Sequence, residues 1–215
     1  MRNHPSRSVS VAAAFAATLW AFLLLPPQQS AWSGADIPPW LGALDRMPLY
    51  DGIRLWLQAI GQQDFYLAFG AAASVSFVLV WFATGPILAE FGRLGRVLGA
   101  LVLLTAPITA LSYLNHPQDA PLHGLWGAEA FMLIFIGVLA LVVAIFSRRG
   151  SGVPVWERVL LGLTLPILVA STFLFTYWPH GTLVGFGLQA AALAAWGKRA
   201  PSTEPSPAGA ALRAA

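Results

Sequence analysis

The chain has 215 residues, of which 57% are hydrophobic and only 10% are charged, and its mean hydropathy is +0.68. This composition is typical of proteins whose surface faces lipid, and it predicts an all-α integral membrane protein. The absence of cysteine excludes thiol catalysis, disulfide bonds and Cys-ligated metal centres. A net charge of +3 does not indicate a nucleic-acid partner here, because the basic residues stand singly or in pairs at the ends of apolar segments.

Six apolar segments are long enough, or nearly long enough, to cross a bilayer, which requires roughly 20 mostly apolar residues. They cover residues 9–25, 65–88, 94–114, 125–146, 159–178 and 182–196. We therefore predict a polytopic helix bundle with six transmembrane helices, forming a single domain over residues 1–199. Residues 200–215 are rich in Pro, Ser and Ala without apolar periodicity, and are expected to be a disordered cytoplasmic tail.

The basic residues predict the orientation of the bundle. Lys and Arg near membrane spans stay preferentially in the cytoplasm. Only Arg46 and Arg54 fall on one side of the predicted spans, while the other side carries Arg2, Arg7, Arg93, Arg96, Arg148, Arg149, Arg158, Lys198, Arg199 and Arg213. Both termini are therefore expected to be cytoplasmic. The abundance of Ala, Gly, Pro and Arg suggests a GC-rich bacterial genome, and so a multi-pass protein of the bacterial inner membrane.

The first apolar segment has two interpretations. Its 17 residues, 9–25, exceed the usual apolar region of a secretory signal, which favours an uncleaved anchor. The basic start and the following "PPQQSAWSGA" also fit a signal peptide that is removed, which would leave five spans in the same orientation.

A long external segment, residues 26–64, is expected between the first two spans. Within it Leu49, Ile53, Trp56 and Ile60 recur at helical spacing and predict an amphipathic external helix, which Asp51 could cap. This helix could serve as a lid or lipid-surface sensor. The alternative is a helix that lies on the outer membrane interface and packs over the bundle.

The stretch "NHPQDAPLHGLWGAEAF", residues 115–131, combines histidines and carboxylates at the expected external face, where His180 also lies. Neutral imidazoles could bind a divalent metal, so His116, His123 and His180 are candidate ligands, although they form no HExxH pair on a helix. The stretch is also typical of a turn between two helices, in which Asp119 caps the second.

Glu129 is the most informative single residue, because an ionisable side chain inside a span usually faces the bundle interior or water. We expect it either to pair with His123 or His180, which would suit proton transfer or cation binding, or to be a shallow glutamate reached by water. Together with Asp119, these residues are the candidates for ligand or proton binding.

Polar and small residues within the later spans predict how the helices pack. Gln189 is expected to form a hydrogen bond across helices, and Gly185 and Gly187 to let helices approach closely. Pro107 and Pro166 lie mid-span and predict kinks.

At its two external turns the chain resembles the bacterial six-span membrane family catalogued as domain of unknown function 998. The likeness covers roughly residues 65–196 and depends on "NHPQDAPLHGLWGAEAF" and "GTLVGFGLQ". The resemblance implies a six-helix bundle without an established activity, and it draws attention to Asp119 and His123.

Three functions are compatible with these patterns. The leading one is a non-enzymatic bundle that binds a lipid, a small ligand or a partner at its external face. The second is a small proton-coupled transporter that uses Glu129 with His123 and His180, and the third is a metal-dependent membrane hydrolase that uses the external His and Asp residues. The bilayer is the one partner that the sequence predicts, and no cofactor is expected unless the histidines bind a metal.

Overall fold

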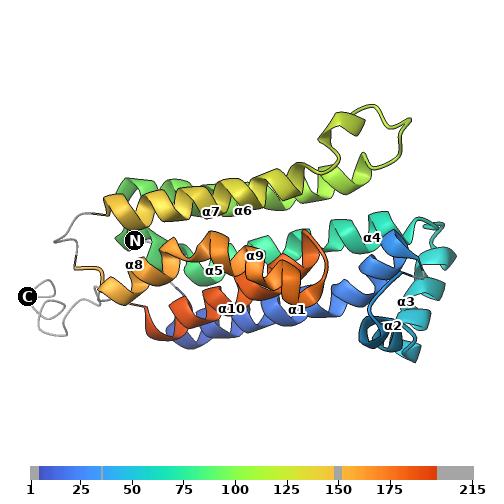
Figure 1. The fold of residues 1–215 in the computed structure, drawn as a ribbon, viewed down its shortest axis with the longest axis horizontal. Helices are drawn as coiled ribbons and strands as arrows, with labels where there is room; N and C mark the ends of the chain where they lie inside the picture. The colour runs from blue at the N-terminus through green and yellow to red at the C-terminus, as the bar shows by residue number, and fades with distance from the viewer. Residues whose placement is uncertain (1–4, 35, 148–151, 198–215) are drawn as a thin grey trace, which may run out of the picture.

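The computed structural model describes residues 5–34, 36–147 and 152–197, and in these residues it contains helices and no strand. Its elements are α1 (Arg7–Ser33), α2 (Pro39–Asp45), α3 (Pro48–Ala59), α4 (Phe65–Ala72), α5 (Ser74–Glu90), α6 (Gly92–Leu114), the short 3-10 helix η1 (His123–Leu125), α7 (Ala128–Phe146), α8 (Val155–Gly162), α9 (Thr164–Phe175) and α10 (His180–Trp196). The long helices run side by side as one elongated bundle, and α2 and α3 gather at one of its ends (Figure 1). The disordered tail predicted over 200–215 lies outside the described residues.

Four stretches of helix are long and apolar enough to cross a membrane: Arg7–Ser33, Phe65–Glu90, Gly92–Leu114 and His123–Phe146. Helices α8 and α9 pass the same test only together, and they are bent by 50° at the break between them, as in a broken span or a re-entrant loop. Large apolar side chains such as Phe135 and Phe173 are 61% and 80% exposed, as lipid-facing positions would be. These features indicate a multi-pass membrane protein.

The sixth predicted span, α10, runs through the middle of the bundle. It has 17 residues, which is about 26 Å at 1.5 Å per residue, less than a full bilayer core. It packs against α1, α5, α8 and α9, and most of its side chains are buried. A Cβ atom at Gly185 would lie 1.8 Å from the Ser171 hydroxyl oxygen, and one at Gly187 would lie 2.5 Å from that of Thr18. The predicted close approach at these glycines is confirmed.

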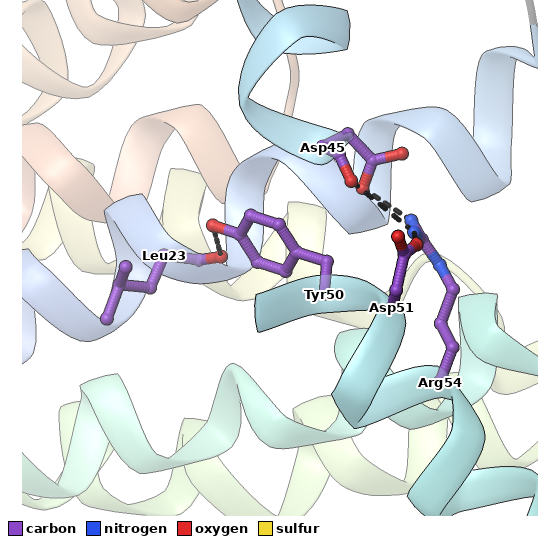
Figure 2. Close-up of polar contacts among 5 residues, drawn as sticks. All are labelled: Leu23, Asp45, Tyr50, Asp51 and Arg54. Atoms are coloured by element: carbon purple, nitrogen blue, oxygen red, sulfur yellow. Dashed lines mark hydrogen bonds and ion pairs between the residues drawn. The ribbon is translucent and has the colours of Figure 1, made fainter. Parts of the chain in front are cut away.

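Helix α1 continues eight residues beyond the predicted end at Leu25, through Pro26 and Pro27 to Ser33, so the predicted external segment does not begin at Pro26. Pro27 has no backbone N–H and leaves the carbonyl of Leu23, four residues earlier, without its helical donor. The hydroxyl of Tyr50, in α3, donates a 2.9 Å hydrogen bond to that carbonyl (Figure 2). A neighbouring element therefore supplies the donor that Pro27 removes.

A helix does form where the amphipathic pattern predicts one, but Asp51 does not cap it. Helix α3 begins at Pro48, with Met47 in the capping position and no side-chain cap. The fixed φ angle of proline suits the first helical position, and this places Asp51 within the first turn. There Asp51 lies 3.5 Å from Arg54, which also forms an ion pair with Asp45 of α2 (Figure 2).

Two breaks between consecutive helices are bridged by side chains from neighbouring helices. Between α4 and α5, the indole N–H of Trp20 donates to the carbonyl of Ala72 at 2.8 Å. Between α8 and α9, the side-chain amide of Gln189 donates to the carbonyl of Leu160 at 2.6 Å and to the hydroxyl of Thr164 at 2.9 Å. The interhelical hydrogen bond predicted for Gln189 is therefore confirmed.

The prolines predicted to kink their helices behave differently. The bend between α8 and α9 lies one turn before Pro166, where a proline ring clashes with the preceding carbonyls, so this kink is confirmed. Pro107 lies inside α6, which continues past it to Leu114 without a break in the helix.

Candidate functional site

A cavity of about 180 Å³ lies where the chain segments converge at the end of the bundle near α2 and α3. Its walls come from the ends of α1, α4, α6 and α7 and from the link between α9 and α10. The lining residues are Trp32, Tyr66, Ser112, Tyr113, Trp126, Gly127, Glu129, Ala130, Tyr177, Trp178 and Pro179. A cavity of about 150 Å³ can accommodate benzene, so this one has room for a small organic molecule.

Aromatic rings form most of the cavity wall. The ring of Trp32 lies 5.3 Å from that of Tyr66 and 5.8 Å from that of Trp126, measured between centroids. The ring of Tyr66 lies 5.2 Å from that of Tyr113. Trp32 and Trp126 are 50% and 39% exposed, whereas Tyr113 and Tyr177 are buried. The aromatic lining therefore leads from solvent-accessible rings to buried ones.

Glu129 borders this cavity and is only 1% exposed. Neither of its carboxylate oxygens has a hydrogen-bond partner among the described residues. The nearest basic group is His180, whose Nε2 atom lies 4.0 Å from one carboxylate oxygen. Burial of a carboxyl group without hydrogen bonds is unfavourable, so packing alone does not account for Glu129.

His180 is the first residue of α10 and is completely buried. Its Nε2 atom lies 2.5 Å from the hydroxyl of Tyr113, and its Nδ1 atom has no hydrogen-bond partner among the described residues. Tyr113, His180 and Glu129 therefore form a buried polar cluster behind the aromatic rings. Of the two partners predicted for Glu129, the structure brings His180 close to it.

The other two candidate histidines pack against outer rings of the cavity, His116 on Tyr66 and His123 on Trp126, and are not part of this cluster. The Nδ1 atom of His116 is 3.6 Å from a carboxylate oxygen of Asp64, and the Nδ1 atom of His123 is 3.2 Å from the carbonyl of Asn115. In the part of the chain that the structure describes, no three His, Asp or Glu side chains are grouped so that they could bind a metal ion. The predicted metal site of His116, His123 and His180 is thus not assembled.

The turn after α6 is organised by residues other than the predicted cap. Asp119 is exposed and caps neither η1 nor α7. The hydroxyl of Ser112 instead accepts a 2.9 Å hydrogen bond from the N–H of Gly127, just before α7 begins. The side-chain oxygen of Asn115 accepts one of 3.1 Å from the N–H of Leu122. The capping prediction for Asp119 is therefore wrong, because helix α6 itself supplies the acceptors.

The aromatic lining is the part of the site that sequence reasoning missed. An interfacial aromatic belt is a sufficient explanation for Trp126, Tyr177 and Trp178 in the sequence. No sequence pattern indicated a binding role for Trp32, Tyr66 or Tyr113. One pattern could have indicated the lining: Trp and Tyr recur at the ends of several predicted spans, on the same side of the membrane as Glu129.

Comparisons with known proteins provide no further guide to the site. No family model, curated protein or solved structure matches the chain. The resemblance to the six-span family stays a prediction, and a function must be inferred from the geometry of the cavity.

Proposed function

We propose that this protein is a six-span membrane protein without a reaction of its own, which binds a small ligand in the cavity beside Glu129. The proposal is based on the burial of the Glu129 side chain and on its lack of hydrogen bonds. Glu129 is buried, both carboxylate oxygens lack hydrogen-bond partners among the described residues, and the side chain borders an aromatic cavity. Ionisable groups inside membrane spans are costly and usually functional.

The distribution of arginines supports an external position for the cavity. The starts of α1 and α6 and the helix α8 lie at the bundle end opposite α2 and α3 (Figure 1). These segments carry Arg7, Arg93 and Arg158, as the positive-inside rule requires of a cytoplasmic end. Arg54, at the cavity end, is paired with Asp45 and Asp51. In this topology both termini are cytoplasmic, α8 with α9 is one bent span, and α10 is the sixth.

The exposed face of α3 supports the same orientation. Leu49, Leu55, Trp56 and Ile60 are between 54% and 66% exposed, while Tyr50 and Leu57 are buried. A short helix with one apolar side uncovered by protein is suited to the membrane interface, where that side is buried among lipid headgroups and acyl chains. We propose that α3 lies on the outer membrane surface next to the mouth of the cavity.

A binding experiment tests the proposed function. We would titrate the full chain in a maltoside detergent with three probes of similar shape: choline, its neutral carbon analogue tert-butylethanol, and the anion 3,3-dimethylbutanoate. Isothermal titration calorimetry should detect saturable binding of at least one probe. Substitution Ala130→Leu, which adds volume to the cavity wall, should abolish that binding.

The matched control is Ala128→Leu, which adds the same volume to a neighbouring position that lines a different hollow of the surface. It should bind the probe as the unmodified protein does. Failure of all three probes, or binding that survives Ala130→Leu, would contradict the proposed function.

The buried polar cluster favours a second candidate, a proton-coupled carrier. The Nε2 atom of His180 lies 2.5 Å from the hydroxyl oxygen of Tyr113 and 4.0 Å from a carboxylate oxygen of Glu129. All three side chains are buried. Such a series of groups could pass a proton to a bound solute. The candidate predicts acidification of vesicles that contain the protein when a solute gradient is applied, and loss of that signal in Glu129→Gln. Accumulation without proton movement would rule it out.

A further inference from the structure

Building on the proposed function, we propose that the cavity recognises a methylated ammonium group, with the aromatic rings as its walls and Glu129 as its counter-ion. Four features of the described residues point to this ligand class: the charge of the lining, the arrangement of the rings, the hydrogen bonds that the lining hydroxyls already make, and the state of His180.

The charge of the lining selects a cation. Glu129 is the one Asp, Glu, Lys or Arg among the described residues that line the cavity. Burial without a partner favours the neutral form of this carboxyl group, and only a cationic ligand would favour its ionised form. A cationic ligand would supply the partner that the two carboxylate oxygens lack.

The rings provide the second attraction. A cation within about 6 Å of the centre of a Trp or Tyr ring is attracted to its face, and the attraction grows when water is excluded. Trp32, Tyr66 and Trp126 stand with neighbouring centroids 5.3 and 5.8 Å apart, so they form a continuous aromatic surface beside the mouth. Tyr113 extends that surface inward, 5.2 Å from Tyr66.

The existing hydrogen bonds favour a methylated ammonium over a primary one. A primary ammonium has three N–H donors, each of which needs an acceptor. The hydroxyls of Ser112 and Tyr113 each already form one hydrogen bond, to Gly127 and to His180, and six of the eleven lining residues present aromatic rings rather than free acceptors. A methylated ammonium has no such requirement, because its methyl groups spread the charge over an apolar surface that packs against rings.

His180 leaves the negative charge of Glu129 available to the ligand. When the hydroxyl of Tyr113 donates to Nε2 of His180, the imidazole is neutral and accepts at the atom that faces Glu129. The carboxylate then has no protein cation to neutralise it within the buried cluster. This arrangement suits a site whose cation arrives with the ligand.

Two molecules could supply the same group. A trimethylammonium ion occurs on free solutes such as choline and on the headgroup of phosphatidylcholine. The mouth of the cavity is at the proposed outer surface of the membrane, where either source can reach it. The recognised chemistry is the same in both cases, and an experiment can separate them.

The test compares choline with tert-butylethanol, which has the same shape with carbon in place of nitrogen. Calorimetry uses the full chain in maltoside detergent, because a phosphocholine detergent would itself compete. We expect choline to bind at least tenfold more tightly than its neutral analogue. Glu129→Gln should reduce that preference several-fold and leave the part that the rings supply, while Asp119→Asn, which removes an exposed carboxylate at the same end, should preserve it.

A second variant keeps the test decisive if Glu129→Gln does not fold. Trp126→Leu removes a partly exposed ring at the mouth and should weaken choline binding several-fold more than it weakens binding of the neutral analogue. Equal affinity of the unmodified protein for choline and tert-butylethanol would overturn the inference. So would a preference for choline that survives either variant unchanged.

Further arms separate the possible outcomes. Binding of tert-butylethanol or 3,3-dimethylbutanoate without binding of choline would leave the proposed function in place and refute the ligand class. Failure of all probes would refute the proposed function itself. If choline binds, a short-chain phosphatidylcholine is then tested as a competitor. Displacement of choline by the phosphatidylcholine at a much lower concentration than that of free choline identifies the ligand as a lipid headgroup. Failure to displace choline identifies it as a free solute.

Discussion

The hydroxyl of Tyr50 donates a hydrogen bond to the carbonyl of Leu23, which is the carbonyl that Pro27 leaves without a helical donor. We expect Tyr50→Phe to lower the free energy of unfolding by about 1 kcal/mol, since the carbonyl would lose its partner. Chemical unfolding in detergent would measure the change. In a Pro27→Ala background the helix regains an N–H, so the same substitution should cost less, and an equal cost in both backgrounds would contradict this assignment.

The same tyrosine should make stability depend on alkaline pH. Burial, and secondarily the negative charge of Asp45, raise the pKa of Tyr50 above its ordinary value of 10.0. The unfolded chain therefore loses this proton at a lower pH than the folded protein does. The stabilisation is complete below pH 10.0 and declines as the pH rises above it. The difference in unfolding free energy between the unmodified protein and Tyr50→Phe should shrink above that pH.

Glu129→Gln should raise the stability of the ligand-free protein. Glutamine has the same shape but no charge to bury, and its amide also lacks partners, so we expect a gain of about 1 kcal/mol. Thermal unfolding without ligand would show a higher Tm. Asp64→Ala is the contrast, because Asp64 accepts from the N–H of Leu67 and caps α4, so its loss should cost about 1 kcal/mol. A lower Tm for Glu129→Gln would mean that its carboxyl group has a structural role.

Gln189→Leu should destabilise the bundle. It removes the donor shared by Leu160 and Thr164 at the bend between α8 and α9, at a cost of about 1 to 3 kcal/mol. Limited proteolysis near residues 160–164 and unfolding in detergent would both detect the loss. Gln58→Leu, at an exposed position of α3, is the control and should change stability little. Equal stability of the two variants would show that the bend does not need this donor.

Gly185→Ala should disturb the packing of α10 on α9. The added methyl group would lie 1.8 Å from the hydroxyl oxygen of Ser171, so the helices would have to separate. Overpacking of this kind costs about 1 to 3 kcal/mol, which exceeds the gain of about 1 kcal/mol in helix propensity. Adding Ser171→Gly should recover part of the loss. Gly124→Ala, with no atom within 4 Å of the new methyl group, should be tolerated.

Local pattern was a good guide to helices that end at conspicuous residues. The span predicted over 94–114 is α6, Gly92–Leu114, because arginines precede its apolar run and Asn115 and Pro117 follow it. The prolines at 26 and 27 misled the same reasoning. They end a helix when no outside donor is available, and the donor here is Tyr50, which is distant in sequence and invisible to helical periodicity.

The candidate site was accessible to sequence reasoning only in part. Glu129 stood out because an acid inside a span is rare, and the predicted topology placed His180 on the same side. The aromatic lining did not stand out, since Tyr66 and Tyr113 resemble ordinary interfacial residues until the turns bring their rings together.

Three side chains donate hydrogen bonds to carbonyls at irregular points of neighbouring helices, and these bonds also limit the axial sliding of the helices. Tyr50, Trp20 and Gln189 each reach one particular backbone carbonyl, on Leu23, Ala72 and Leu160. A shift of α10 by one turn, about 5.4 Å, would leave the Leu160 carbonyl without its donor in a space that water does not supply. Packing of apolar surfaces alone would tolerate such sliding. The irregular points of this bundle therefore set its axial register, and with it the distance between His180 at the start of α10 and Glu129 at the start of α7.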